Sequence, residues 1–135
     1  MKAKLMITLS LVTVALIAAG FKMQDQKNPW PVPDKFKNMK NPVTSDAESL
    51  KAGKTLWSKH CQSCHGKTGL GDGTKAAQLK TDPGNFSATG FQDQTDGAIF
   101  YKTTEGRDDM PGFKKKIPDH DEIWSIVNFV RTLKK

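Results

Sequence analysis

Five consecutive residues, Cys61-Gln62-Ser63-Cys64-His65, bring together three side chains that can do chemistry. Two thiols separated by two residues, with a histidine directly after the second, form the C-x-x-C-H pattern for covalent attachment of a c-type haem. Each thiol can add to one vinyl group of the porphyrin, and the following imidazole is then held beneath the iron. The pattern therefore predicts one haem c attached through Cys61 and Cys64, with His65 as one axial ligand.

Two cysteines at this spacing can also form a redox-active dithiol or contribute to a structural zinc site. A redox-active dithiol is expected beside a strand–helix–strand unit, whereas here a helical pattern precedes the cysteines and a glycine-rich loop follows them. A structural zinc site normally takes four Cys or His ligands. The chain has two cysteines, and His60 and His120 lack the spacing of zinc-finger ligands. Haem attachment is therefore favoured over both.

Residues 1–20 have the layout of a secretory signal peptide. Lys2 and Lys4 give a positively charged start, an uncharged and mostly apolar run follows over residues 5–19, and Gly20 ends a group of small residues. A run of about 15 residues is short of the ~20 that a membrane-spanning helix needs, so we expect cleavage after Gly20. The protein is then exported, to the periplasm or the outer face of the cytoplasmic membrane.

Charge and length exclude some function classes. The formal charge is +7, and removal of the two leader lysines leaves +5. A nucleic-acid-binding protein is expected to be more basic and to carry a recognisable motif, and neither is found. Residues 44–135 suffice for one small domain with a thin core, which a buried haem would enlarge.

Residues 21–43 form a proline-containing N-terminal arm or linker. The prolines of this segment are Pro29, Pro31, Pro33 and Pro42. Prolines at this density predict an extended chain. Two interpretations stay open, a plain linker and an arm whose Trp30 and Phe36 pack across the folded domain.

Hydrophobic periodicity predicts helices and no strand, hence an all-α domain. A first helix begins at a capping box of Ser45 and Glu48 and leads into Cys61. A weaker helix is expected from Thr95 to about Glu105, and a short one near residues 75–79. A strongly apolar helix follows Asp119.

Gly53 interrupts the apolar pattern of the first helix. As a simple defect it would cost ~1 kcal/mol. The alternative, which we favour, is close approach of the last helix, with Trp57 packing on Ile126 and Phe129.

The order of these features resembles a small bacterial class I cytochrome c. A helix, the C-x-x-C-H motif, a glycine-rich loop at residues 66–73, a middle helix, a Met-Pro pair and a final amphipathic helix follow one another over about residues 44–135. The resemblance implies an all-α fold of about three to five helices around one covalently attached haem. It also implies a mono-haem electron carrier with histidine–methionine ligation.

Met110 is the expected second axial ligand. It precedes Pro111 in the loop after the middle helix, and a thioether on iron stabilises the ferrous state. Met23 and Met39 lie in the arm and are weaker candidates. His120 is the main rival because bis-histidine ligation also occurs in haem proteins.

The carbonyl partner of the His65 ring stays open. Many members of the family supply it from a proline in the loop after the motif, but Thr74 stands where that proline often lies. Gly69 and Leu70 are the candidates for the carbonyl. The turn at 82–86 is similar to one that walls the haem pocket in the family.

The leading functional hypothesis is an extracytoplasmic electron carrier between redox complexes, with no catalytic residue of its own. Lys114, Lys115 and Lys116 predict a patch for acidic docking surfaces, for example on a terminal oxidase or dehydrogenase. No binding to nucleic acid is expected. Contact with a membrane is expected only through protein partners or an uncleaved leader. The alternatives are a haem enzyme or sensor whose sixth position opens, and a dedicated electron-transfer subunit of a dehydrogenase or oxidase.

Overall fold

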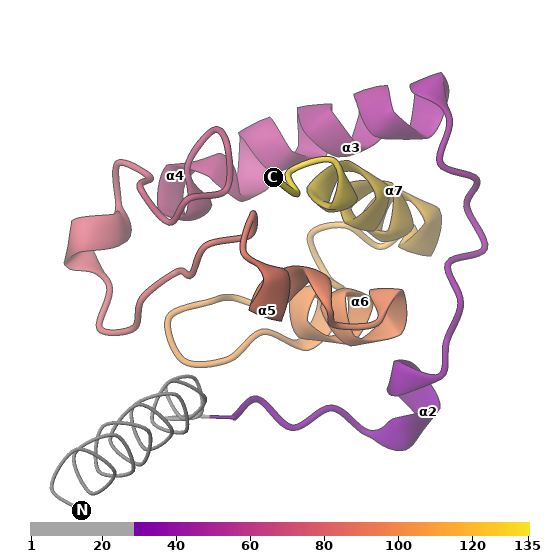
Figure 1. The fold of residues 1–135 in the computed structure, drawn as a ribbon, viewed down its shortest axis with the longest axis horizontal. Helices are drawn as coiled ribbons and strands as arrows, with labels where there is room; N and C mark the ends of the chain where they lie inside the picture. Colours follow the sequence, from indigo (N-terminus) through magenta and orange to yellow (C-terminus); the bar gives the residue numbers. More distant parts are fainter. Residues whose placement is uncertain (1–28) are drawn as a thin grey trace, which may run out of the picture. The chain divides into compact units, whose positions relative to one another are not determined.

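The computed structural model describes residues 29–135, so the predicted signal peptide and the start of the arm lie outside the described residues. The chain divides into two compact units, 1–31 and 32–135, and the second carries the site. Its elements are α2 (Asp34–Lys37), α3 (Ala47–His60), α4 (Gln62–His65), the 3₁₀ helix η2 (Ala76–Gln78), α5 (Thr89–Gln92), α6 (Asp96–Glu105) and α7 (His120–Arg131). Figure 1 shows this all-helical arrangement.

The all-α prediction is confirmed. Residues 29–135 contain six α-helices and no strand, against the three to five helices expected. The additional helices arise because α2, α4 and α5 are single turns of four residues each, too short to show a helical period in the sequence. No helix in this part of the chain has the length and apolar character needed to cross a membrane.

Helix α3 begins one residue later than predicted. Asp46, not Ser45, is the N-cap: its carboxylate accepts the backbone N–H of Ser49 at 2.9 Å, and the Ser49 hydroxyl lies 3.1 Å from the backbone N of Asp46. The predicted pairing of Ser45 with Glu48 is therefore wrong. A carboxylate suits the positive end of the helix dipole, and the Ser49 hydroxyl also donates to the carbonyl of Thr44 at 2.7 Å.

Helices α3 and α7 pack against each other at Gly53, as Figure 1 shows for the two helices. A Cβ atom on Gly53 would lie 2.0 Å from the carbonyl oxygen of Ser125 on α7. One turn further along α3, the Trp57 ring centroid lies 5.9 Å from that of Phe129. Trp57 and Ile126 belong to one buried cluster. The predicted close approach of the last helix is confirmed.

Helix α6 matches its prediction and packs on α7. Thr95 caps its N-terminus by accepting the N–H of Ala98, and Gly106 follows its last residue. The rings of Phe100 on α6 and Trp124 on α7 are stacked, with centroids 4.1 Å apart. Because Trp124 is 2 % exposed, this contact belongs to the core beneath the site.

Part of the predicted arm packs on the helical unit. Phe36 of α2 places its ring 4.7 Å from that of Tyr101 on α6. The amide of Asn41 donates to the side-chain oxygen of Asn128 on α7 at 2.8 Å. Over residues 34–41 the segment therefore behaves as a packed arm and not as a plain linker.

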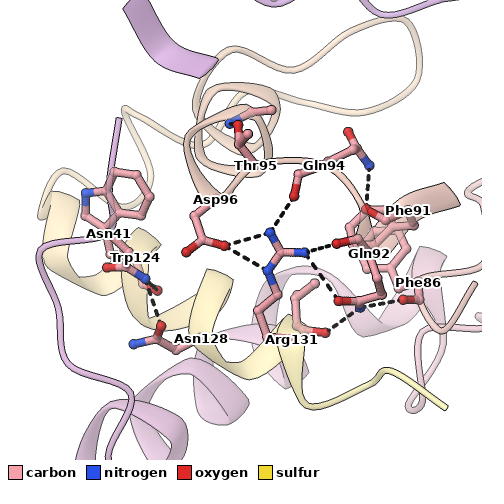
Figure 2. Close-up of polar contacts among 12 residues, drawn as sticks. Asn41, Phe86, Phe91, Gln92, Gln94, Thr95, Asp96, Trp124, Asn128 and Arg131 are labelled. Atoms are coloured by element: carbon pink, nitrogen blue, oxygen red, sulfur yellow. Dashed lines mark hydrogen bonds and ion pairs between the residues drawn. The ribbon is translucent and has the colours of Figure 1, made fainter. Parts of the chain in front are cut away.

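Arg131, at the last residue of α7, orders the turn between α5 and α6. Its guanidinium donates to the carboxylate of Asp96 at 2.8 Å and to the backbone carbonyls of Gln92 at 2.7 Å and Gln94 at 2.6 Å. Figure 2 shows these bonds converging on one side chain. The planar fork of donors is pre-organised for acceptors that lie in different directions, a fixed geometry that a lysine ammonium on its flexible stem does not offer.

Candidate functional site

The C-x-x-C-H residues lie at the end of α3, as the sequence predicted, and most of them form the short helix α4, which it did not predict. Helix α3 ends at His60, Cys61 follows, and α4 runs from Gln62 to His65. Both thiols are free, with Cys61 buried and Cys64 partly buried. Burial, and to a smaller extent the neighbouring Cys64, raise the pKa of Cys61 to about 12. The two sulfurs are therefore available on one short turn, with Cys61 protonated at neutral pH.

The glycine-rich loop wraps around this turn through its backbone. Four backbone N–H groups of residues 66–75, the glycine-rich loop and the two residues after it, each donate to one carbonyl of α4: Gly66 to Gln62 at 2.9 Å, Lys75 to Ser63 at 2.7 Å, Gly73 to Cys64 at 3.2 Å, and Gly71 to His65 at 2.9 Å. The bond from Gly66 closes the last turn of α4, and the other three satisfy carbonyls that a helix end leaves without internal partners. The loop thereby fixes the geometry of the motif without using side chains.

The close wrapping requires glycine at position 73. A Cβ atom there would lie 2.4 Å from the carbonyl oxygen of Ser63 and 2.6 Å from that of Cys64. Both obstacles are backbone atoms, which cannot rotate away. Gly73 therefore lets the loop backbone reach the end of α4.

The carbonyl partner of His65 is Pro83. The Nδ1 atom of His65 lies 3.0 Å from the carbonyl oxygen of Pro83, so neither Gly69 nor Leu70 has the proposed role. A carbonyl only accepts, so Nδ1 must carry the proton and Nε2 keeps a free lone pair. Burial lowers the pKa of His65, and the bond to Pro83 partly opposes this. The ring is thus a neutral imidazole whose one available nitrogen can bind a metal.

Aromatic rings pack beside His65. The Phe86 ring centroid lies 4.6 Å from that of His65, and the Trp57 centroid lies 5.7 Å from it. Phe86 is stacked on Phe91 at 4.0 Å. The indole N–H of Trp57 also donates to the carbonyl of Gly66 at 3.1 Å. The imidazole is therefore held by an apolar wall as well as by Pro83.

Met110 lies partly buried in a tight loop between α6 and α7. Its backbone exchanges two hydrogen bonds with Arg107, one in each direction, at 2.8 and 2.9 Å. Asp108, between them, has φ of 50°, a left-handed conformation that aspartate tolerates better than most residues. A Cβ on Gly106 would lie 2.3 Å from the backbone nitrogen of Gly112, so the two ends of the loop touch. These contacts hold the backbone around Met110 in one local conformation.

The rival ligands predicted from the sequence have other surroundings. His120 is the exposed first residue of α7, with its ring 5.5 Å from that of Phe100. His60 packs against Phe113 at 5.9 Å. Met39 is exposed, and Met23 lies outside the described residues. Within residues 29–135, no group of three His, Cys, Asp or Glu side chains could hold a metal ion.

The three consecutive lysines are not equivalent. Lys114 forms an ion pair with Glu105 at 2.8 Å. The ammonium of Lys116 lies 5.7 Å from the ring centroid of Phe113. Burial, and then the positive charges of Lys59 and Lys116, lower the pKa of His60. Lys59 and Lys116 therefore place positive charge near His60, at the end of α3. Because Lys114 is paired with Glu105, it adds less to the predicted patch of three lysines than the sequence suggested.

Comparisons with known proteins place these features in a family. A family model described as "Cytochrome C oxidase, cbb3-type, subunit III" matches residues 48–130. The chain is similar to a solved structure from the Kuenenia stuttgartiensis reducing HAO-like protein complex, with 24% identity, a TM-score of 0.65, and coverage of 82% of this chain and 53% of that one. This chain thus spans about half the length of that protein, and the similarity between the two is one of fold.

A second solved structure, the KustC0563 c-type cytochrome, is 29% identical with a TM-score of 0.54, over 62% of this chain and 98% of that one. No match was found among curated proteins. Because the family model covers more than half of the sequence and the fold agrees, the chain belongs to this family of c-type cytochrome domains and is a class I c-type cytochrome, an electron-transfer protein.

Proposed function

We propose that this protein is an exported mono-haem electron carrier in which Cys61 and Cys64 hold the haem c and His65 and Met110 bind its iron. The observation that carries the proposal is the bond from His65 Nδ1 to the carbonyl of Pro83 at 3.0 Å. It commits one ring nitrogen and leaves the other as a ligand, directly beside two free thiols. This combination of donors fits a c-type haem.

When bound, the haem supplies an iron that gains and loses one electron. Cys61, Cys64, His65 and Met110 would hold that group in the protein. Trp57 and Phe86 support the His65 side. Met110, whose backbone is held by two hydrogen bonds to Arg107, would supply a thioether, a ligand that raises the reduction potential and suits electron transfer. An iron that held both His65 and Met110 would have no open position for a substrate, which would favour a carrier over an enzyme or sensor.

Covalent attachment is tested by mass. The purified exported protein should exceed the mature polypeptide by the mass of one haem, and acidified solvent should not extract the haem. Cys61→Ser should bind the haem through one thioether, and Cys61→Ser/Cys64→Ser should leave it extractable. Haem that leaves the parent protein in acid would contradict the assignment of both cysteines.

Ligation by Met110 is tested by the ferric spectrum. A methionine sulfur on ferric iron gives a near-infrared charge-transfer band that water and histidine do not give. Met110→Ala should lose this band and bind exogenous ligands, while Met110→His should stay six-coordinate at a lower potential. Met39→Ala is the matched control and should keep the band. A band that persists in Met110→Ala would transfer the assignment to another methionine.

Export is supported by the layout of residues 1–20. Expression of the full chain should deliver the protein to the periplasmic fraction with residue 21 at its N-terminus, read by N-terminal sequencing. Replacement of Lys2 and Lys4 by glutamate should reduce export, since the positive start is part of the signal. Protein that stays in the cytoplasmic fraction without haem would contradict this part of the proposal.

Docking to an acidic redox partner is supported by the mature charge of +5, the formal +7 less the two leader lysines. Because Lys114 is paired with Glu105, the effect should rest on Lys115 and Lys116. Lys115→Glu/Lys116→Glu should slow second-order electron transfer at low salt and leave the haem spectrum unchanged. The parent's rate should fall as salt rises, because screening acts over ~8 Å at physiological ionic strength.

A dedicated oxidase or dehydrogenase subunit is the second candidate, because the matching family is described as an oxidase subunit. A permanently bound subunit would co-purify with its complex, and its electron-transfer rate would not depend on salt. Both results together would replace the shuttle with the subunit.

A further inference from the structure

Asp109 joins two loops that are far apart in the sequence. Its Oδ2 atom accepts the backbone N–H of Lys80 at 2.6 Å and that of Thr81 at 3.2 Å. The Thr81 hydroxyl lies 3.5 Å from the same oxygen. One carboxylate oxygen thus receives two successive backbone donors, and hydrogen bonds to an ionised acceptor are stronger than those between neutral groups.

Each end of this contact leads to a proposed axial ligand. Asp109 directly precedes Met110 in the chain. Thr81 lies two residues before Pro83, whose carbonyl accepts the ring N–H of His65. The support of His65 and the loop that carries Met110 are therefore tied together by one side chain.

The neighbouring polar residues do not duplicate this contact. Asp82 accepts the backbone N–H of Gly84 at 2.8 Å, and Asn85 accepts that of Ser87 at 2.9 Å, so both brace their own turn. The turn around Pro83 is stiffened from within, whereas Asp109 links residues 80 and 81 to the Met110 loop.

We infer that Asp109 is a positioning residue that keeps the Met110 loop closed against the loop supporting His65. Loss of its bonds lets the Met110 loop open more often, so that an added ligand reaches the iron. The inference rests on the proposed ligation by Met110. It concerns the oxygen of Asp109 that accepts the backbone N–H groups of Lys80 and Thr81.

The test is imidazole binding to the ferric holoprotein. Imidazole must displace Met110, so its apparent affinity follows the fraction of molecules with the loop open. Asp109→Ala should raise the apparent affinity about tenfold, equivalent to ~1.4 kcal/mol. Asp109→Asn keeps an accepting oxygen without the charge and should raise it by about threefold. Asp93→Ala, an equal change of charge at an exposed residue outside both loops, should leave it unchanged.

Amide hydrogen exchange gives a readout that does not involve the iron. The amides of Lys80 and Thr81 should exchange faster in Asp109→Ala, because they lose their acceptor. An imidazole affinity within twofold of the parent, or unchanged exchange at both amides, would overturn the inference. If Asp109→Ala does not fold, Asp109→Asn carries the test, and the absence of an increase counts against the inference.

The experiments distinguish an error in the proposed ligation by Met110 from an error in the positioning role of Asp109. A near-infrared band that survives Met110→Ala overturns the ligand assignment, whatever Asp109 does. If Met110→Ala loses the near-infrared band but Asp109→Ala binds imidazole with unchanged affinity, the ligand assignment stands and only the positioning role of Asp109 is overturned.

Discussion

Gly53 is a position where one added methyl group should damage the packing of α3 on α7 directly. A Cβ atom there would lie 2.0 Å from the carbonyl oxygen of Ser125 and 2.9 Å from the Cβ of Phe129. Ordinary contact begins at 3.4 Å, so α3 and α7 would have to separate locally by about 1.4 Å, the difference between 3.4 and 2.0 Å. The obstacle is backbone, which no side-chain rotation can remove.

We expect Gly53→Ala to lower the free energy of unfolding by about 2 kcal/mol. Overpacking costs ~1–3 kcal/mol and occasionally more, and a clash between two helix backbones belongs at the upper end of this range. Replacing a helical glycine by alanine returns only ~1 kcal/mol. In a domain of about 100 residues each kcal/mol lowers Tm by ~4–8 °C, so Tm should fall by about 8–16 °C. Thermal unfolding of the holoprotein, followed by far-ultraviolet circular dichroism, measures the change.

Thr55→Ala is the matched control for this substitution. Thr55 is exposed on the same helix, and its hydroxyl donates only to the carbonyl of Lys51 within that helix, at 2.9 Å. Its Tm should stay close to that of the parent, since surface changes of this kind stay within ~0.5 kcal/mol. A Gly53→Ala protein as stable as the parent would refute the close backbone contact between α3 and α7.

Two further predictions concern charged side chains. Arg131→Lys should lower the free energy of unfolding, measured with urea, by ~1–2 kcal/mol. Asp96→Asn should lower it less, because that variant keeps the bonds from Arg131 to the two backbone carbonyls. Equal losses would contradict this. Lys59→Gln should raise the pKa of His60, read by proton NMR, because one of the positive charges that lower it is removed; Lys114→Gln, whose ammonium pairs with Glu105, should not.

The main helices could be predicted because their signals are local. Thr95 and Gly106 frame α6 by a side-chain cap and a positive φ of 70°, both properties of single residues. The start of α3 was misjudged by one residue because Ser45 and Asp46 are both good caps with a suitable partner three residues on. Sequence alone could not decide between them. The contacts of the Ser49 hydroxyl with Thr44 and with Asn128 on α7 favour the later start.

The carbonyl for His65 could not be predicted because it depends on the path of a long loop. Pro83 is 18 residues from His65 in the chain. The expected position for a proline, after Gly-Asp-Gly, holds Thr74. The turn at 82–86 resembles a turn that walls the haem pocket in the family, which indicates that it lies near the haem site. No short-range pattern in the sequence, however, indicates that the Pro83 carbonyl contacts the His65 ring.

The glycine-rich loop accounts for how Pro83 reaches the ring. Backbone N–H groups of residues 66–75 donate to the four carbonyls of α4, and these bonds anchor this stretch against the C-x-x-C-H turn. From this anchored stretch, the carbonyl of Gly69 accepts the N–H of Phe86 at 2.7 Å, and a Cβ on Gly69 would lie 3.0 Å from that of Phe86. This bond fixes the segment three residues beyond Pro83. The orientation of His65 therefore depends on backbone contacts between two loops, and a proline at position 74 is not needed to supply its partner.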